Sequence, residues 1–375
     1  MPAALGSPTR GRPRFRLFRA GSGRTAASWA ARSSRSEGGA RVSSVLDDTG
    51  LWRDVTELPS TLAETLDRAD RREVAALVGG TGVRRIVASG NGAAYYVSVA
   101  LWLASLEGAA GPEVVAVPSG LLARGGFAWR PGDVFLAVSS SGEFRDLVEA
   151  VDADAPTPYA AVTANADSTL GSRAGARALV SVPNQRAVTH TQAFCGAVAA
   201  ALAVWAEVTH DRELDAALGG LPGELERTIS GARTWVDDQG GIDAATAVVF
   251  GSGPAWAGAL EAALLLKEVS GLPAEGVETR EGATSAMMAL GPGALALSLA
   301  GAEDPLLTEA EEACAGQGAT VVRTPRPDST DRRLAAVSTF PAATALAARL
   351  GIERGLDVDR PAWTDAYYKV ARRTA

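Results

Sequence analysis

Residues 134–148 read Val-Phe-Leu-Ala-Val-Ser-Ser-Ser-Gly-Glu-Phe-Arg-Asp-Leu-Val. An apolar run followed at once by a polar, amphipathic segment predicts a buried strand, a tight turn and a helix. The turn brings together the hydroxyls of Ser139, Ser140 and Ser141 and the N–H groups that open the helix. Such a place binds anions, phosphate above all. Capping needs only one serine, so three favour a ligand, to which Arg145 can add a charge-assisted contact.

Strand-like and helix-like segments alternate along the chain from about residue 80 onward. This alternation predicts an α/β fold of the doubly wound kind, in which parallel sheets carry helices on both faces. Helices are expected at residues 93–107, 191–208, 216–240, 254–270, 304–316 and 341–353. Strands are expected at residues 84–89, 113–117, 133–138, 159–163, 178–182, 247–250, 294–299, 319–322 and 334–338.

The second half of the chain repeats the first. Gly90-Asn91-Gly92 recurs as Gly251-Ser252-Gly253, 161 positions later, and at the same offset Glu107 matches Glu268. We interpret this as a tandem duplication of one domain of about five strands; two unrelated strand–glycine–helix units are the alternative. The expected divisions are lead-in helices at 42–79, a first domain at 80–215, a linking helix at 216–240, a second domain at 241–356 and a C-terminal tail at 357–375.

Composition excludes several classes of function. The 375 residues carry a net charge of −7, which disfavours a nucleic-acid partner. Cys195 and Cys314 stand far apart and are expected to be small core residues, without a disulfide framework or a zinc pattern. With only two histidines, a multi-histidine metal site is excluded, and we expect no metal and no cofactor. No apolar run reaches the roughly 18 residues that span a bilayer, so no membrane partner is expected.

Residues 1–41 differ from the rest, because they are rich in arginine and serine and contain no acid before Glu37. This composition is typical of an organellar transit peptide. A disordered tail, or a start codon assigned too early in a GC-rich gene, also accounts for it, and we favour these interpretations because the rest of the chain is rich in alanine, arginine and glycine too. We therefore expect a soluble, cytoplasmic protein.

Two further segments carry candidate site residues. Ser89-Gly90-Asn91-Gly92 is a strand–helix turn that lets the backbone approach a ligand closely; Tyr95 breaks the dinucleotide-binding spacing. Near the middle of the second half, three carboxylates fall within seven residues and can supply a general base, although a solvated loop has the same composition. These carboxylates are Glu275, Glu278 and Glu281.

Four motifs together resemble the tandem-domain form of the sugar isomerase (SIS) family, over about residues 74–375. The closest patterns are those of the isomerase half of glutamine–fructose-6-phosphate aminotransferase and of related amino-sugar isomerases and deglycases. The matching segments are the serine turn at 139–143, Val188-Thr-His-Thr-Gln-Ala-Phe194, the helix from Leu260 to Ser270, and Asp357-Val-Asp-Arg-Pro361.

The resemblance implies a sugar phosphate bound at the serine turn, with Gln185, Thr189 and His190 as further binding residues. It also implies a glutamate that moves a proton between adjacent carbons, either Glu278 or Glu281 according to register.

A lysine of the C-terminal tail should complete the site, and Lys369 stands near its position, although isolated lysines there are usually solvated. The protein is expected to be a homodimer.

Departures from the family pattern leave the reaction open. Phe144 replaces the threonine that closes the phosphate loop, Gly92 replaces a serine or threonine, and the family's ring-opening histidine is missing. An aldose–ketose isomerase, a deaminase or a deglycase acting on an acyclic substrate fits these residues. A non-catalytic sugar-phosphate sensor is the alternative.

Overall fold

The computed structural model describes residues 42–68, 70–108, 110–301, 304–328 and 331–371, with the backbone alone for 42–44. The arginine-rich segment 1–41, with the transit-peptide and tail interpretations placed on it, lies outside the described residues. Short helices lead into the first strand: α1 Val42–Asp47, α2 Gly50–Thr56, α3 Leu58–Asp67 and α4 Arg71–Val78.

The first half builds a parallel sheet of five strands in the order β2-β1-β3-β4-β5. Side chains of β1 alternate between two buried layers, since Ile86 and Ala88 face one apolar cluster and Val87 faces another. Burial on both faces is what helices packed on both sides of a parallel sheet produce. The strands are β1 Arg85–Ser89, β2 Glu113–Ala116, β3 Asp133–Val138, β4 Ala160–Thr163 and β5 Ala176–Leu179, with helices α5 Ala93–Ser105, α6 Ser119–Ala123, α7 Arg145–Ala153 and α8 Thr169–Arg173 between them.

The second half repeats this arrangement with a four-stranded parallel sheet in the order β7-β6-β8-β9. Strands β6, β7 and β8 each begin 161 positions after β1, β2 and β3, the offset of the sequence repeat. The predicted α/β fold of two duplicated parallel sheets is therefore confirmed, with four strands instead of about five in the second sheet. The elements are β6 Thr246–Gly251, α11 Ala255–Ser270, β7 Ala274–Glu278, α12 Thr279–Thr284, η3 Ala286–Ala289, β8 Ala294–Ser298, α13 Pro305–Gly316 and β9 Thr320–Arg323.

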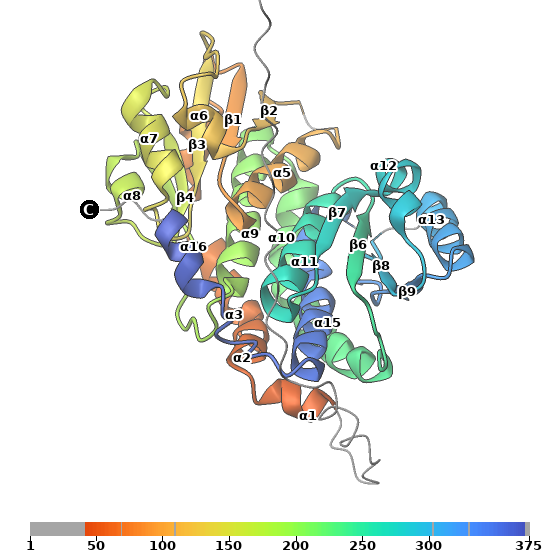
Figure 1. Cartoon of the computed structure of the whole chain (residues 1–375). Helices are drawn as coiled ribbons and strands as arrows, with labels where there is room; N and C mark the ends of the chain where they lie inside the picture. The colour runs from red at the N-terminus through yellow and green to blue at the C-terminus, as the bar shows by residue number, and fades with distance from the viewer. Residues whose placement is uncertain (1–41, 69, 109, 302–303, 329–330, 372–375) are drawn as a thin grey trace, which may run out of the picture. The chain divides into compact units, whose positions relative to one another are not determined.

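Long helices pack between the two sheets (Figure 1). One buried apolar cluster includes residues of both sheets and of these helices, so the two halves share a core. Helices α9 and α10 follow the first sheet, and the last helices follow the second. Their bounds are α9 Thr191–Thr209, α10 Arg212–Trp235, η2 Val236–Asp238, η4 Arg332–Leu334, α14 Ala335–Ser338, α15 Phe340–Glu353 and α16 Thr364–Ala371.

Two helical stretches, Thr191–Thr209 and Arg332–Glu353, are long and apolar enough to cross a membrane, contrary to the expectation from the sequence. Their most apolar windows are 89% and 94% buried inside the protein, as in the core helices of a soluble domain. Cys195 and Cys314 are buried and free, which confirms them as core residues.

The secondary structure differs from the sequence-based expectation in three places. Residues 334–338 form helix and not a strand, because Asp331 accepts a hydrogen bond from the Arg333 N–H and starts a helical turn there. A short buried apolar run cannot be assigned to strand or helix by periodicity alone. Residues 274–278 are an additional strand at the sheet edge, where charged side chains are common. Within the predicted C-terminal tail, residues 364–371 form helix α16, where no helix was expected.

Candidate functional site

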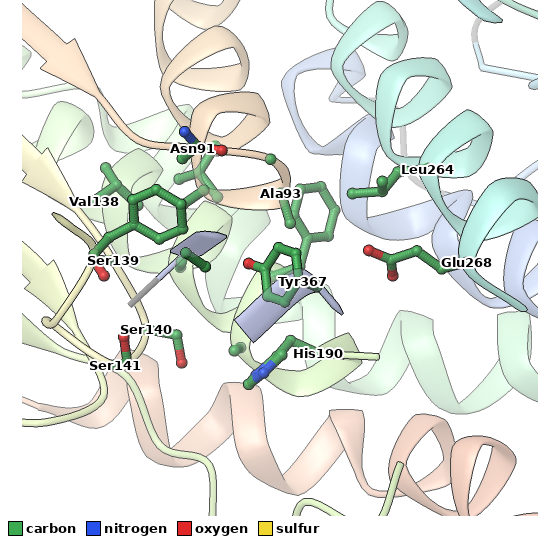
Figure 2. A pocket seen from close by; sticks show the side chains of 18 of the residues that line it. Asn91, Ala93, Val138, Ser139, Ser140, Ser141, His190, Leu264, Glu268 and Tyr367 are labelled. Atoms are coloured by element: carbon green, nitrogen blue, oxygen red, sulfur yellow. The ribbon is translucent and has the colours of Figure 1, made fainter. Parts of the chain in front are cut away.

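A cavity of about 300 Å³ lies where the first sheet meets the helices between the halves. One wall comes from the ends of β1 and β3, the two strands between which the connections reverse direction. Open parallel sheets bind ligands at this switch point. The other walls come from the start of α9, from one face of α11, and from α16, which carries aromatic side chains into the cavity (Figure 2).

The serine turn follows β3 directly and forms one wall. The Ser139 N–H donates to the Val162 carbonyl of the neighbouring strand, which anchors the turn to the sheet. The Ser139 hydroxyl then accepts from the Gly142 N–H at 3.1 Å, and the Ser141 hydroxyl accepts from the Glu143 N–H at 3.2 Å. These bonds hold the turn in a fixed shape.

Capping of α7 does not account for the serines. Phe144 is the N-cap residue, and no side chain caps the helix. Among the described residues, none forms a hydrogen bond with the Ser140 hydroxyl or with the N–H groups of Ser140 and Ser141. These donors line the cavity, so they are available to an anionic group.

Gly142 makes the turn possible. Its φ is +68°, and a Cβ atom there would lie 1.9 Å from the Ser168 hydroxyl oxygen, so no other residue fits. Glu143 folds away from the serines, since its carboxylate accepts from the Thr169 N–H and hydroxyl at 2.7 and 2.8 Å. The acidic side chain is thereby held in a defined position at the rim.

The glycine turn after β1 borders the serine turn. Gly90 lies so close to α5 that a Cβ atom would be 2.3 Å from the Ala94 carbonyl carbon. This tight turn places Asn91 and Gly92 in the cavity wall. The Asn91 amide donates to the Ser119 hydroxyl at 3.2 Å, which orients its side chain.

Helix α11 supplies the acidic wall opposite. Glu261, Leu264 and Glu268 line the cavity. Spacings of three and seven residues place all three on one face of a helix. Figure 2 shows the Glu268 carboxylate across the cavity from the three serines. A carboxylate and an anion-binding turn therefore face the same small space.

Both carboxylates on this face have perturbed acidity. Burial raises the pKa of Glu268 to about 7, an effect that the Thr189 hydroxyl and Lys267 oppose. Burial also raises the pKa of Glu261 well above its usual range, and the neighbouring Glu268 raises it further. Glu261 is 3% exposed, and among the described residues its Oε2 has no hydrogen-bond partner. A carboxyl that titrates near neutral pH in a cavity is suited to proton transfer.

His190 lies at the start of α9 and closes the floor of the cavity. Partial loss of solvent around the ring lowers the pKa of the imidazole, which favours the neutral form. Hydrogen bonds within the preceding loop hold its conformation. The Gln185 amide donates to the Ala187 and Thr189 carbonyls at 2.7 and 2.9 Å. Gln185 therefore supports the loop and does not line the cavity.

Trp363 and the helix α16 that follows it cover the cavity with aromatic side chains. Trp363, Tyr367 and Tyr368 line the space, and adjacent rings pack edge to face with centroids 5.6 and 5.3 Å apart. The Trp363 indole N–H donates to the Glu268 backbone carbonyl at 2.9 Å. This bond ties the tail to the helix that carries the acidic wall.

The residues singled out from the sequence divide into two groups. Those that line the cavity are Asn91, Gly92, Ser139, Ser140, Ser141 and His190. Those outside its lining are Ser89, Gly90, Arg145, Gln185, Thr189, Glu275, Glu278, Glu281 and Lys369.

Local contacts hold several residues of the second group. Arg145 contacts Asp146 and Glu149 on its own helix. The Glu278 carboxylate accepts from the N–H groups of Arg280 and Glu281 as the N-cap of α12. Lys369 is exposed on α16.

The sequence-based reasoning missed the two acids of α11 and the aromatic residues of α16. A signal for the acids was present, since Glu261 and Glu268 are two turns apart on a helix otherwise rich in alanine and leucine. Charges on a buried apolar helix are rare unless they have a function or a partner. Among the described residues, no group of three or more His, Cys, Asp or Glu side chains is placed to hold a metal ion.

Comparison with known proteins identifies the fold. No protein-family model and no curated protein sequence matches the chain. Among solved structures, glucosamine-6-phosphate deaminase from Thermotoga maritima matches with a TM-score of 0.69 and 18% identity, over 84% of this chain and 98% of that one. The chain has the sugar isomerase (SIS) fold.

Two further SIS-fold structures show the same likeness. The C-terminal domain of glucosamine-fructose-6-phosphate aminotransferase from Francisella tularensis gives a TM-score of 0.70 and 16% identity, over 84% of this chain and 98% of that one. Tagatose-6-phosphate ketose/aldose isomerase from Escherichia coli gives a TM-score of 0.65 and 18% identity, over 86% of this chain and 97% of that one. Each match spans both halves of the chain, so the tandem arrangement is shared.

Proposed function

We propose that this protein binds a phosphorylated sugar or amino sugar in the cavity and acts on it as an isomerase, deaminase or deglycase. The observation that carries the proposal is a carboxyl with a pKa of about 7, that of Glu268, facing an anion-binding serine turn. The names of the SIS-fold structures, which include a deaminase and a ketose/aldose isomerase of sugar phosphates, support the substrate class.

In the proposed reaction, the phosphate lies at the serine turn and the carbons next to the carbonyl lie beside α11. Glu268 as a carboxylate removes the proton from one carbon while the carbonyl oxygen takes up a proton, which gives an enediol or enolamine. The proton on Glu268 then returns to the former carbonyl carbon as the hydroxyl or amine on the first carbon loses its proton, which gives the isomeric carbonyl compound or an imine. In a deaminase or deglycase, water adds to this imine and the amine leaves. A group that titrates near the working pH performs both steps efficiently. Neutral His190 at the cavity floor can donate to or accept from a sugar hydroxyl.

Glu278 and Glu281 remain the rival candidates from the sequence. Their backbone and side-chain contacts lie on α12, outside the cavity lining. We therefore propose Glu268 as the base, and we propose that Tyr367 and Tyr368 cover the substrate where a tail lysine was expected.

Substitution of single glutamates distinguishes these candidates. In Glu268→Gln, we expect turnover of fructose 6-phosphate or glucosamine 6-phosphate, and exchange of the carbon-bound proton with D₂O, to fall by a factor of about 10²–10⁴. Binding should persist, because the amide keeps the shape of the side chain. Glu309→Gln, at an exposed position on α13, is the matched control. If Glu278→Gln or Glu281→Gln abolishes exchange while Glu268→Gln does not, the assignment fails.

A non-catalytic sugar-phosphate sensor is the second candidate, and one observation favours it. The described residues that line the cavity include Glu143, Glu261 and Glu268 but no lysine or arginine. A sensor should show a higher melting temperature with sugar phosphates but no proton exchange in any of them. Turnover of either test sugar excludes this candidate.

The homodimer and the cytoplasmic location also stay predictions. Sedimentation of the full chain tests the first, and fractionation of the source cells tests the second.

A further inference from the structure

A second hollow, a groove of about 560 Å³, opens beside the site cavity. Val188, His190 and Tyr368 line both the cavity and the groove, so the two hollows meet at these three side chains. A ligand held in the cavity can therefore extend past His190 and Tyr368 into the groove. A simple sugar phosphate needs only the cavity, and the groove is additional space.

The groove differs from the cavity in that arginine side chains line it. The groove is lined by two arginines, Arg186 and Arg360, and by one acid, Asp365. Arg186 is already engaged, because its Nη1 donates to Asp54 at 2.9 Å and its Nη2 to Glu57 at 2.5 Å. Arg360 is exposed, and over the described parts of the chain no side-chain hydrogen bond or ion pair joins it to Asp365 or to any other residue.

The backbone that carries Arg360 is fixed on both sides. The Asp357 carboxylate accepts from the N–H groups of Asp359 and Arg360 at 3.0 and 2.9 Å. The Asp359 carboxylate accepts from two N–H groups at the start of α2, at 2.8 and 2.7 Å. The Asp359 carbonyl accepts from Val188 N–H, in the wall that the two hollows share. The backbone at Arg360 is therefore fixed, so binding has to order only the exposed side chain.

We propose that the groove is a subsite for the anionic end of a substituent that the sugar carries beyond its reacting carbons. The inference rests on the proposed function, and it narrows the substrate to a sugar-phosphate adduct whose arm ends in a carboxylate or a phosphate. A guanidinium binds either group through paired hydrogen bonds. The acidic, aromatic cavity holds the reacting part, and Arg360 holds the far end.

The test compares ligands that differ only at the end of the arm. Fructose 6-phosphate has no arm, and three synthetic ketosamine 6-phosphates carry the same six-carbon arm ending in methyl, carboxylate or phosphate. Calorimetric titration of the full chain should show the anionic arms binding roughly tenfold more tightly than the methyl arm, since a hydrogen bond between charged groups supplies that factor. The preferred anion tells whether a carboxylate or a phosphate is recognised.

Arg360→Gln should abolish this preference and leave the binding of fructose 6-phosphate and of the methyl arm unchanged. Arg212→Gln, at an exposed position on α10 outside both hollows, should keep the preference. Melting curves of both variants confirm folding.

If the wild type shows no preference, or if Arg360→Gln leaves it intact, the inference is overturned while the proposed function stands. If none of the four ligands binds or exchanges protons, the proposed function fails and the inference fails with it.

Discussion

Replacement of Glu268 by glutamine should make the free energy of unfolding less dependent on pH. The folded protein holds the pKa of this group at about 7, whereas the ordinary value, which applies in the unfolded chain, is 4.5. Below pH 4.5, both states carry the proton and the fold has its full stability. As the pH rises toward 7, the unfolded chain releases the proton and the folded protein retains it, so the free energy of unfolding falls. Above pH 7 the loss is complete.

The size of the loss follows from the two pKa values. Each pKa unit is worth about 1.4 kcal/mol, so the rise from 4.5 to about 7 corresponds to roughly 3 kcal/mol. Glu268 keeps some contact with solvent, which reduces this figure, and we expect roughly 2 to 3 kcal/mol. In Glu268→Gln the side chain stays neutral at every pH, so the variant does not suffer this loss.

Urea denaturation of the wild type and of Glu268→Gln at several pH values between 4.5 and 8 measures the effect. The free energy of unfolding of the variant, minus that of the wild type, should increase by roughly 2 to 3 kcal/mol over this range. The Glu268 carboxylate also raises the pKa of Glu261, so the substitution removes that contribution as well, and both effects make the difference increase with pH. Glu309→Gln, at an exposed position on α13 outside the cavity, is the control measured in parallel. A difference between Glu268→Gln and the wild type that is flat, or that decreases as the pH rises, refutes the idea that burial raises this pKa.

Three other expectations concern activity and stability. If Glu268 is the base, kcat/KM should rise with pH through an apparent pKa near 7, since only the carboxylate accepts a proton; a rate independent of pH between 5 and 9 would count against it. Arg85 and Asp133 form a buried bidentate pair at 2.9 and 2.6 Å between adjacent strands, so Asp133→Ala should cost about 3–5 kcal/mol in urea denaturation. Gly142→Ala must move Ser168 and adopt a positive φ, so we expect the free energy of unfolding to fall by roughly 1–3 kcal/mol. Calorimetry should also show weaker binding of sugar phosphate. Unchanged binding would mean that the serine turn does not bind the ligand.

Features encoded by neighbouring residues were predictable from the sequence. The buried strand, the serine turn and the helix at 134–148 each depend on a local pattern, and all three form as predicted. The repeat of Gly90-Asn91-Gly92 at 251–253 indicated the duplication, because a close strand–helix turn requires glycine in both copies. The α/β class and most strand positions follow from the same kind of information.

Only the tertiary structure brought the two walls of the cavity together. Ser140 and Glu268 are 128 positions apart, and they share one cavity because α11 packs between the sheets and α16 folds back over it. The acidity of Glu268 depends on that packing, since burial and not the neighbouring sequence raises its pKa. Sequence patterns indicate which face of a helix or strand is apolar. Which of several glutamates is the best candidate for the base depends on distances and desolvation, and these arise only when distant segments pack together.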